Sequence, residues 1–297
     1  MLFNIAICCD NRYVVPSLVT IISLFENNKL EKFHVYIITD NKTENNKTKF
    51  KKIQDTYKQT IEICEINFTK FLKLHSVGRY ATPTYYRFVL SDIIKDDRVL
   101  YLDGDIIVRH NISELYNTPL EGFACAAVYD QNYDDPRLFN MLHLKEIYFN
   151  AGVLLININY WRKNNIANKL FDFILTNKEI CPFQDQDGLN YILQGHVKLI
   201  SPTYNFQACW YYPLKMRLVH FSKWAEIDKY KNDPVIVHFC DDYKPWYKEC
   251  RHPFAIEWKM YGFKHDFINA KIIHRYSLVY RSFSHISSFI KNLIHLF

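Results

Sequence analysis

The sequence has little or none of several features that mark special classes of protein. Glycine is scarce, at 7 of 297 residues, and nothing in the composition indicates a fibrous or disordered chain. The 8 cysteines are scattered without a CxxC pair, which is typical of a reduced protein and argues against zinc sites and disulfides. No apolar stretch is long enough to span a bilayer, and the N-terminal segment lacks the basic leader of a signal peptide. These absences predict a cytoplasmic protein, with attachment to a membrane surface left open.

The composition that is present suits a large folded domain. Apolar residues make up 49% of the chain and aromatic residues 16%, which is ample for the buried core of one domain or one and a half. The formal net charge of +6 is a mild basic bias. It suits anionic ligands or an anionic membrane surface, and it is too weak to argue for nucleic acid as a partner.

Two aspartates interrupt an otherwise apolar stretch over residues 98–108, which we expect to form a strand buried on both faces. Buried carboxylates such as Asp103 and Asp105 are costly unless they are paired, hydrogen-bonded or bound to a cation. Gly104 between them would allow a bend that brings both onto one divalent ion, and would leave room for a ligand near the backbone. From this motif alone, an edge turn with two solvated aspartates is an equally good interpretation.

The rest of the chain alternates between strand and helix patterns. Strands are expected over residues 2–9, 33–39, 60–66, 124–129, 149–157, 197–200 and 235–239. Helices are expected over residues 14–28, 42–57, 84–90, 111–116, 159–177 and 183–190. This alternation predicts an α/β fold with a parallel sheet, helices on both faces, and ligands beyond the carboxyl ends of the strands. Residues 131–148 are polar, aromatic and irregular, and we interpret them as a loop or lid over a site.

Several polar side chains stand out, each with a plain structural alternative. Arg87 lies in an apolar stretch and needs an anionic partner, either a carboxylate of the site or Asp92. Asp185 and Asp187 fall in the first turn of a predicted helix, where the helix dipole alone would favour them. His238 ends the last predicted strand, where a histidine is more often a hydrogen-bonded core residue than a ligand.

The chain carries four motifs in order: Tyr101-Leu102-Asp103-Gly104-Asp105, Asn150-Ala151-Gly152, Asp185-Gln186-Asp187, and His238 followed by Lys244-Pro245-Trp246. Their order and spacing resemble those of the family 8 retaining glycosyltransferases, above all the bacterial lipopolysaccharide galactosyl- and glucosyltransferases. Each motif alone is weak, but their co-occurrence is highly specific. The chain resembles this family from residue 2 to about residue 250. The resemblance implies a GT-A fold, in which a mainly parallel nucleotide-binding sheet is flanked by helices, over residues 1–262.

The resemblance also implies a set of site residues. The metal ligands would be Asp103, Asp105 and His238, holding Mn²⁺, or Mg²⁺ as a substitute, together with a UDP-sugar donor. The residues implied at the nucleotide, diphosphate and donor sugar are Cys8, Asp10, Tyr13, Arg87, Asp103, Gly104, Asn150, Ala151 and Lys244. The implied catalytic positions around the sugar and the acceptor are Asp130, Asp185 and Gln186.

Two positions depart from the family pattern. Arg12 stands where relatives often have Asn, and Asp241 stands where they usually have a Gly that approaches a phosphate. Asp241 must therefore turn away from the diphosphate or weaken its binding. Retention of configuration follows from the resemblance alone. Double displacement would need Asp185 or Gln186 as nucleophile, whereas front-face substitution needs only a polarised leaving group, and we favour the second.

Residues 263–297 differ in character from the rest. Apolar side chains recur there at steps of three and four, with Lys and Arg interspersed. We expect a basic amphipathic helix, or two, that binds an anionic membrane; the alternative is a helix packed on the core or in an oligomer. A position on the cytoplasmic face of the inner membrane would suit a lipid-linked saccharide acceptor.

The prediction is therefore a metal-dependent retaining enzyme that moves galactose or glucose from a UDP-sugar to a lipopolysaccharide or lipooligosaccharide core. One alternative keeps the chemistry but uses a protein or another glycan as acceptor. A second, from another class, is a metal-dependent nucleotidyltransferase or phosphohydrolase. A third is a protein that binds nucleotide sugars without catalysis. The sequence does not distinguish galactose from glucose, because the two differ in the orientation of one hydroxyl, and it does not indicate the oligomeric state.

Overall fold

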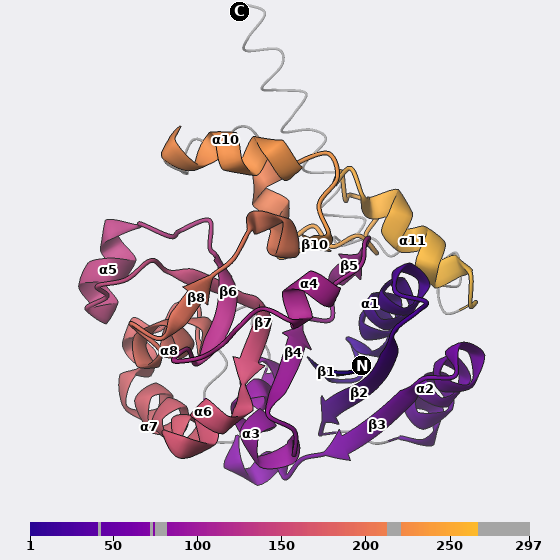
Figure 1. Cartoon of the computed structure of the whole chain (residues 1–297), viewed down its shortest axis with the longest axis horizontal. Coiled ribbons are helices and arrows are strands. Elements are labelled where there is room, and N and C mark those ends of the chain that lie inside the picture. The colour runs from indigo at the N-terminus through magenta and orange to yellow at the C-terminus, as the bar shows by residue number, and fades with distance from the viewer. Residues whose placement is uncertain (41–42, 72–73, 75–81, 213–220, 267–297) are drawn as a thin grey trace, which may run out of the picture. The chain divides into compact units, whose positions relative to one another are not determined.

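The structure is a computed structural model that describes residues 1–40, 43–71, 74, 82–212 and 221–266 (Figure 1). Contacts divide the chain into two compact units, residues 1–240 and residues 241–297. The first unit holds both sheets, and the second holds helix α11 (Ala255–Phe263). None of the helices in these described ranges is long and apolar enough to cross a membrane.

The larger sheet has seven strands in the order β3-β2-β1-β4-β7-β6-β8 (Figure 1). Its strands are β1 (Leu2–Cys8), β2 (Lys32–Thr39), β3 (Thr60–Glu65), β4 (Arg98–Leu102), β6 (Cys125–Tyr129), β7 (Phe149–Asn157) and β8 (Val197–Leu199). Only β7 among these strands runs antiparallel to its neighbours, β4 and β6. The pairs β1–β2, β1–β4, β2–β3 and β6–β8 are parallel. The predicted mainly parallel α/β sheet is confirmed.

The sheet is covered on both faces, as the unbroken apolar runs predict. Side chains of successive strand residues point to opposite faces, and in β4 Val99, Leu100, Tyr101 and Leu102 are all buried. Val99 and Tyr101 belong to a core cluster shared with the 3₁₀ segment η2 (Thr82–Val89). Leu100 and Leu102 point to the other face. Strands buried in this way need no polar alternation.

Most helices lie close to the predicted ranges, with three corrections, and no helix was predicted where α10 and α11 lie. They are α1 (Val14–Asn27), α2 (Glu44–Tyr57), α3 (Leu90–Ile93), α4 (Ser113–Tyr116), α5 (Pro136–Leu142), α6 (Ile158–Lys163), α7 (Ile166–Asn177), α8 (Asp185–Ile192) and α10 (Phe221–Tyr230). The helix expected over 84–90 is the 3₁₀ segment η2 followed by α3. In η2 the carbonyl of Thr84 accepts a hydrogen bond from Nε of Arg87, whereas in an α-helix it would accept one from a backbone N–H. The helix expected over 159–177 is divided by Asn165, which adopts φ 52°.

The expected loop over 131–148 contains the third correction, because α5 lies within it. Asp135 caps this helix by accepting a hydrogen bond from the backbone N–H of Arg137, and Pro136 occupies the first helical position. This helix is only seven residues long, and its two buried leucines, Leu138 and Leu142, form a single apolar repeat that is too short to mark it in the sequence.

The smaller sheet has three strands in the order β5-β10-β9, formed by β5 (Ile106–Val108), β10 (Ile236–His238) and β9 (Phe206–Gln207). The chain passes from the larger sheet to the smaller one between Leu102 and Ile106. The single strand expected over 98–108 is therefore wrong in its continuity. The hydroxyl of Thr20 in α1 donates to the carbonyls of Gly104 and Ile106, 3.1 and 2.9 Å away, and holds the chain in this bend.

Candidate active site

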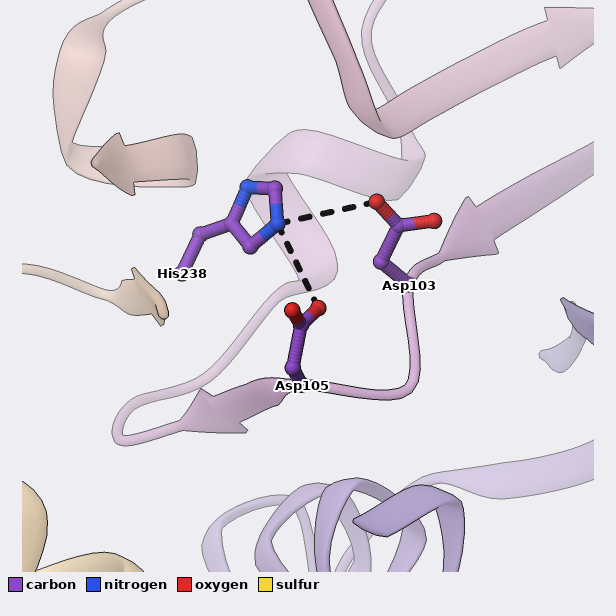
Figure 2. Close-up of side chains that lie close together, drawn as sticks. All are labelled: Asp103, Asp105 and His238. Atoms are coloured by element: carbon purple, nitrogen blue, oxygen red, sulfur yellow. Dashed lines mark ion pairs between the residues drawn. The ribbon is translucent and has the colours of Figure 1, made fainter. Parts of the chain in front are cut away.

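Asp103, Asp105 and His238 meet where the two sheets adjoin (Figure 2). Asp103 follows the end of β4, Asp105 precedes β5, and His238 ends β10, opposite Ile106 in the antiparallel pair. Nε2 of His238 lies 3.6 Å from Oδ2 of Asp103 and 3.4 Å from Oδ1 of Asp105. Asp105 and His238 are buried, while Asp103 is partly exposed. The structure thus brings together the three predicted metal ligands.

The spacing of these groups fits a hexacoordinate divalent cation. One ligand atom from each side chain lies within 4.8 Å of the others. In an octahedral site with bonds of about 2.1 Å, adjacent ligand atoms lie about 3 Å apart, so slight closure would complete the set. Two carboxylates with one imidazole suit Mn²⁺ or Mg²⁺ better than the thiolate-preferring metals. The residues fit the implied ion.

Gly152 makes room for this cluster. A Cβ at residue 152 would lie 2.1 Å from Cε1 of His238 and 2.9 Å from Oδ2 of Asp103. Any side chain there would displace the imidazole or the carboxylate. The carbonyl of Gly152 also accepts a hydrogen bond from the backbone N–H of Asp103 at 2.8 Å, so β7 positions the first ligand directly.

Arg87 pairs with carboxylates of the site rather than with Asp92. It is buried, and its Nη2 lies 3.0 Å from Oδ1 of Asp103 while its Nε lies 3.0 Å from Oδ2 of Asp185. Its Nη1 donates to the carbonyl of Ala151 at 2.6 Å, and its guanidinium lies over the ring of Tyr101. Of the two kinds of partner considered for Arg87, the carboxylates of the site are therefore the ones that it contacts.

Asp130, Asn150, Ala151 and Gln186 form a second polar group. Oδ2 of Asp130 accepts hydrogen bonds from Nδ2 of Asn150 at 2.9 Å and from Nε2 of Gln186 at 3.2 Å. Oε1 of Gln186 accepts a hydrogen bond from the backbone N–H of Ala151 at 2.9 Å. Burial raises the pKa of Asp130, although these amides favour its ionised form. These predicted residues lie together and hold one another in place.

Asp185 and Asp187 both lie in the first turn of α8 and both are buried. Burial raises the pKa of Asp185 to about 6, against the opposing effect of Arg87, and that of Asp187 to about 7. Asp185 contacts Arg87 and the hydroxyl of Thr84. Asp187 accepts hydrogen bonds from the hydroxyl of Tyr148 and the backbone N–H of Phe183, each at 2.6 Å. Asp185 thus contacts the site through Arg87, while Asp187 accepts its hydrogen bonds at the start of α8.

Comparison with known proteins assigns this arrangement to a family. The sequence matches the family described as Glycosyl transferase family 8 over residues 4–250. The chain belongs to glycosyltransferase family 8. The general stress protein A of Bacillus subtilis is 28% identical over 88% of this chain and 93% of its own length. A lipopolysaccharide 1,3-galactosyltransferase of Salmonella typhimurium is 28% identical, covering 85% of this chain and 75% of its own length. A lipopolysaccharide 1,2-glucosyltransferase of Escherichia coli is 28% identical, covering 82% and 73%.

A solved structure supports the same fold. The galactosyltransferase LgtC, in complex with donor and acceptor sugar analogs, matches with a TM-score of 0.79 and 23% sequence identity. The match covers 91% of this chain and 98% of that one. The GT-A fold expected of a family 8 glycosyltransferase is therefore confirmed.

The residues predicted at the nucleotide lie at the end of β1 in this family 8 chain. Cys8 is buried, and burial raises its pKa well above its ordinary value. Asp10 accepts hydrogen bonds from the backbone N–H groups of Arg12 and Tyr13, and pairs with the guanidinium of Arg12 at 2.7 Å. Arg12, the departure from the family pattern, therefore engages a predicted nucleotide-binding carboxylate.

Gly104 lies against the start of α1. A Cβ there would lie 2.7 Å from Oγ of Ser17 and 3.2 Å from the ring of Tyr13. The absent side chain thus gives room to two protein groups, one of which, Tyr13, is itself predicted to contact the donor. The bend itself needs no left-handed backbone, because Gly104 is not among the described residues with positive φ.

The remaining predicted features lie elsewhere. Lys244 and Asp241 belong to the second compact unit, and their relation to a diphosphate stays a prediction. Residues 267–297, most of the expected amphipathic tail, lie outside the described residues. The division into 1–262 and 263–297 also stays a prediction.

Sequence reasoning missed Asn205. It is fully buried, and its Oδ1 lies 3.0 Å from Nδ1 of His238. Residues 204–212 carry only an aromatic pattern, so nothing in their spacing pointed to the site. The parallel pairing of β9 with β10, which sets His238 opposite Gln207, brings Asn205 there.

Proposed function

We propose that this family 8 chain is a divalent-metal-dependent hexosyltransferase that moves galactose or glucose from a UDP-sugar to a lipopolysaccharide or lipooligosaccharide core, with retention of configuration. The observation that carries the proposal is the convergence of Asp103, Asp105 and His238 beside the polar group of Asp130, Asn150 and Gln186, to which Asn205 connects His238. We assign this polar group to the donor sugar and call it the sugar-side group. The names of the lipopolysaccharide glucosyl- and galactosyltransferase relatives support both the hexose and the acceptor.

When bound, Mn²⁺ would supply positive charge that stabilises the UDP leaving group. Asp103, Asp105 and His238 would hold the ion. Cys8, Asp10 and Tyr13 would bind the nucleoside, and Lys244 would add a positive charge at the diphosphate. Asp130, Asn150 and Gln186 would orient the hydroxyls of the hexose.

Front-face substitution remains the mechanism we favour for retention. Both ends of the Gln186 amide are engaged, by Ala151 N–H and by Asp130. Asp185 is bonded to Arg87 and to Thr84, and freeing its carboxylate for attack would leave a buried arginine with less compensation. A mechanism that needs only a polarised leaving group and a positioned acceptor makes no such demand.

The acceptor and the location are proposed together. A lipid-linked saccharide lies at the membrane, and the basic amphipathic pattern of residues 263–297 would bring the enzyme to the cytoplasmic face of the inner membrane. A protein or another glycan as acceptor is the alternative within the same chemistry.

Release of UDP without an acceptor tests the donor. The full chain would be incubated with Mn²⁺ and a panel of UDP-sugars, and slow hydrolysis of one hexose donor is expected. The same assay with EDTA, or with Asp103→Asn, should give no release. Release of pyrophosphate, or of phosphate from a simple nucleotide, would instead favour the nucleotidyltransferase or phosphohydrolase alternative. Equal UDP release in EDTA would refute the metal assignment.

A further inference from the structure

Asn205 contacts the side of His238 that faces away from the two aspartates. It is fully buried and ends the 3₁₀ segment η4 (Pro202–Asn205), directly before β9. Its Oδ1 lies 3.0 Å from Nδ1 of His238, and its Nδ2 donates to Oδ1 of Asn150 at 2.8 Å. One buried amide therefore connects a metal ligand to the sugar-side group.

A backbone amide sets the direction of each hydrogen bond in this chain of side chains. The N–H of Gly152 can only donate, and it donates to Oδ1 of Asn150 at 3.0 Å. The amide nitrogen of Asn150 is then left to donate to Oδ2 of Asp130 at 2.9 Å. Because Oδ1 of Asn150 is an acceptor, Asn205 must present its NH₂ group to it.

The orientation of Asn205 in turn decides which nitrogen of His238 carries a proton. With its NH₂ group toward Asn150, Asn205 presents its carbonyl oxygen to Nδ1 of His238, so that Nδ1 must donate. The reverse orientation would place two amide oxygens 2.8 Å apart in a buried site, where an unsatisfied pair is costly. Nε2 is then the nitrogen that faces Asp103 and Asp105.

We propose that Asn205 is a positioning residue that keeps a proton on Nδ1 of His238 and commits Nε2 to the metal. Metal-bound histidines usually donate their other ring N–H to an oxygen acceptor, which fixes the tautomer and the ring orientation. Here the acceptor is an amide whose own direction is fixed by Asn150 and Gly152. The inference rests on the proposed metal-dependent function and extends it to a residue that would not touch the ion.

The tautomer can be observed directly. The full chain would be labelled with ¹⁵N-histidine and studied by long-range ¹H–¹⁵N correlation in the presence of Mg²⁺, which is diamagnetic. The signals of His238 would be assigned by their loss in His238→Gln. A protonated Nδ1 is expected. An Nδ1 without a proton, with the proton on Nε2, would overturn the proposal, and this measurement needs no variant of Asn205.

Metal affinity tests the consequence. Mn²⁺ would be titrated calorimetrically into the wild type and Asn205→Leu. Asn205→Leu removes the acceptor at similar volume and should weaken Mn²⁺ binding about 10- to 100-fold. Wild-type affinity in Asn205→Leu would refute the positioning role.

A matched control separates this effect from the loss of any buried amide. Asn28, at the end of α1, is also buried; it donates to the carbonyl of Leu24 at 2.9 Å and accepts from the N–H of Ile112 at 2.9 Å. Asn28→Leu should lower thermal stability and leave Mn²⁺ affinity unchanged. Neither readout uses a sugar donor. If the wild type binds Mn²⁺ but releases no UDP from any donor, the proposed function fails while the role of Asn205 stands.

Discussion

Gly152 and His238 are so close that the glycine has no room for even one carbon more. A Cβ at 152 would lie 2.1 Å from Cε1 and 2.6 Å from Nδ1 of the imidazole. Gly152→Ala should therefore push the ring away from Asp103 and Asp105 and weaken Mn²⁺ binding at least about tenfold. It should also lower the free energy of unfolding by about 1–3 kcal/mol, the usual cost of overpacking. Calorimetric titration and urea unfolding measure the two effects.

Gly188→Ala is the control for a new methyl group in the same unit. Its Cβ would lie 3.0 Å from Cδ1 of Ile174 and 3.7 Å from Cδ2 of Leu170, and none of the metal ligands is among its nearest neighbours. Mn²⁺ affinity should stay at the wild-type value in this variant. Wild-type affinity in Gly152→Ala would contradict the proposed metal site.

Arg87 should matter for stability because it is the buried cation between two carboxylates. Arg87→Met leaves Asp103 and Asp185 without it and should cost about 3–5 kcal/mol of unfolding free energy, measured in urea. Arg87→Lys should not restore this stability, since one ammonium group cannot replace a planar guanidinium that contacts four acceptors. Adding Asp185→Asn to Arg87→Met should recover part of the loss. Strictly additive effects in this double-mutant cycle would show that Arg87 and Asp185 are not coupled.

Asp187 should make the protein less stable as the pH rises. Burial raises the pKa of Asp187 from its ordinary value of 3.8 to about 7, so the folded chain holds the proton of this carboxyl more tightly than the unfolded chain does. Between about pH 4 and pH 7 the folded state binds the extra proton, and its stabilising contribution is lost as the pH rises through this window. Three pKa units set an upper bound of about 4 kcal/mol. Asp187→Asn should flatten the difference in unfolding free energy between pH 5 and pH 8; an unchanged difference would mean that another group causes it.

His238 should be needed for metal binding and dispensable for folding. His238→Ala should weaken Mn²⁺ binding and abolish metal-dependent UDP release, with circular dichroism unchanged. His34, which pairs with Glu62 on the larger sheet, provides the control, and His34→Ala should bind Mn²⁺ normally. Unchanged Mn²⁺ affinity in His238→Ala would make it a hydrogen-bonded core histidine.

Removal of the end of the chain tests the membrane proposal. A chain cut after Gly262 should lose binding to vesicles that contain anionic lipid, because the basic amphipathic pattern lies beyond that residue. The full chain should bind less as salt increases. A truncated chain that still sediments with the vesicles would show that another surface is responsible.

The sequence was sufficient where local pattern and burial agree. Apolar runs predicted the strands of the larger sheet, and the spacing of the four motifs predicted the family. It failed at 98–108, because the pairing partners of a strand, and not its own residues, decide that β4 and β5 join different sheets. Asn205 was out of reach for the same reason, since only the pairing of β9 with β10 brings it to His238.

The bend between β4 and β5 has a consequence for the dynamics of the molecule. Asp103 directly follows β4 of the larger sheet, whereas Asp105 directly precedes β5 of the smaller sheet and His238 ends β10. An ion held by all three would cross-link the two sheets, and ligand binding to the folded state stabilises whatever it joins. Metal binding should therefore slow the local opening that exposes the amides of β5 and β10 to hydrogen exchange. The strands β5 and β10, which flank or carry two of the metal ligands, would therefore be more rigid with the ion bound than without it.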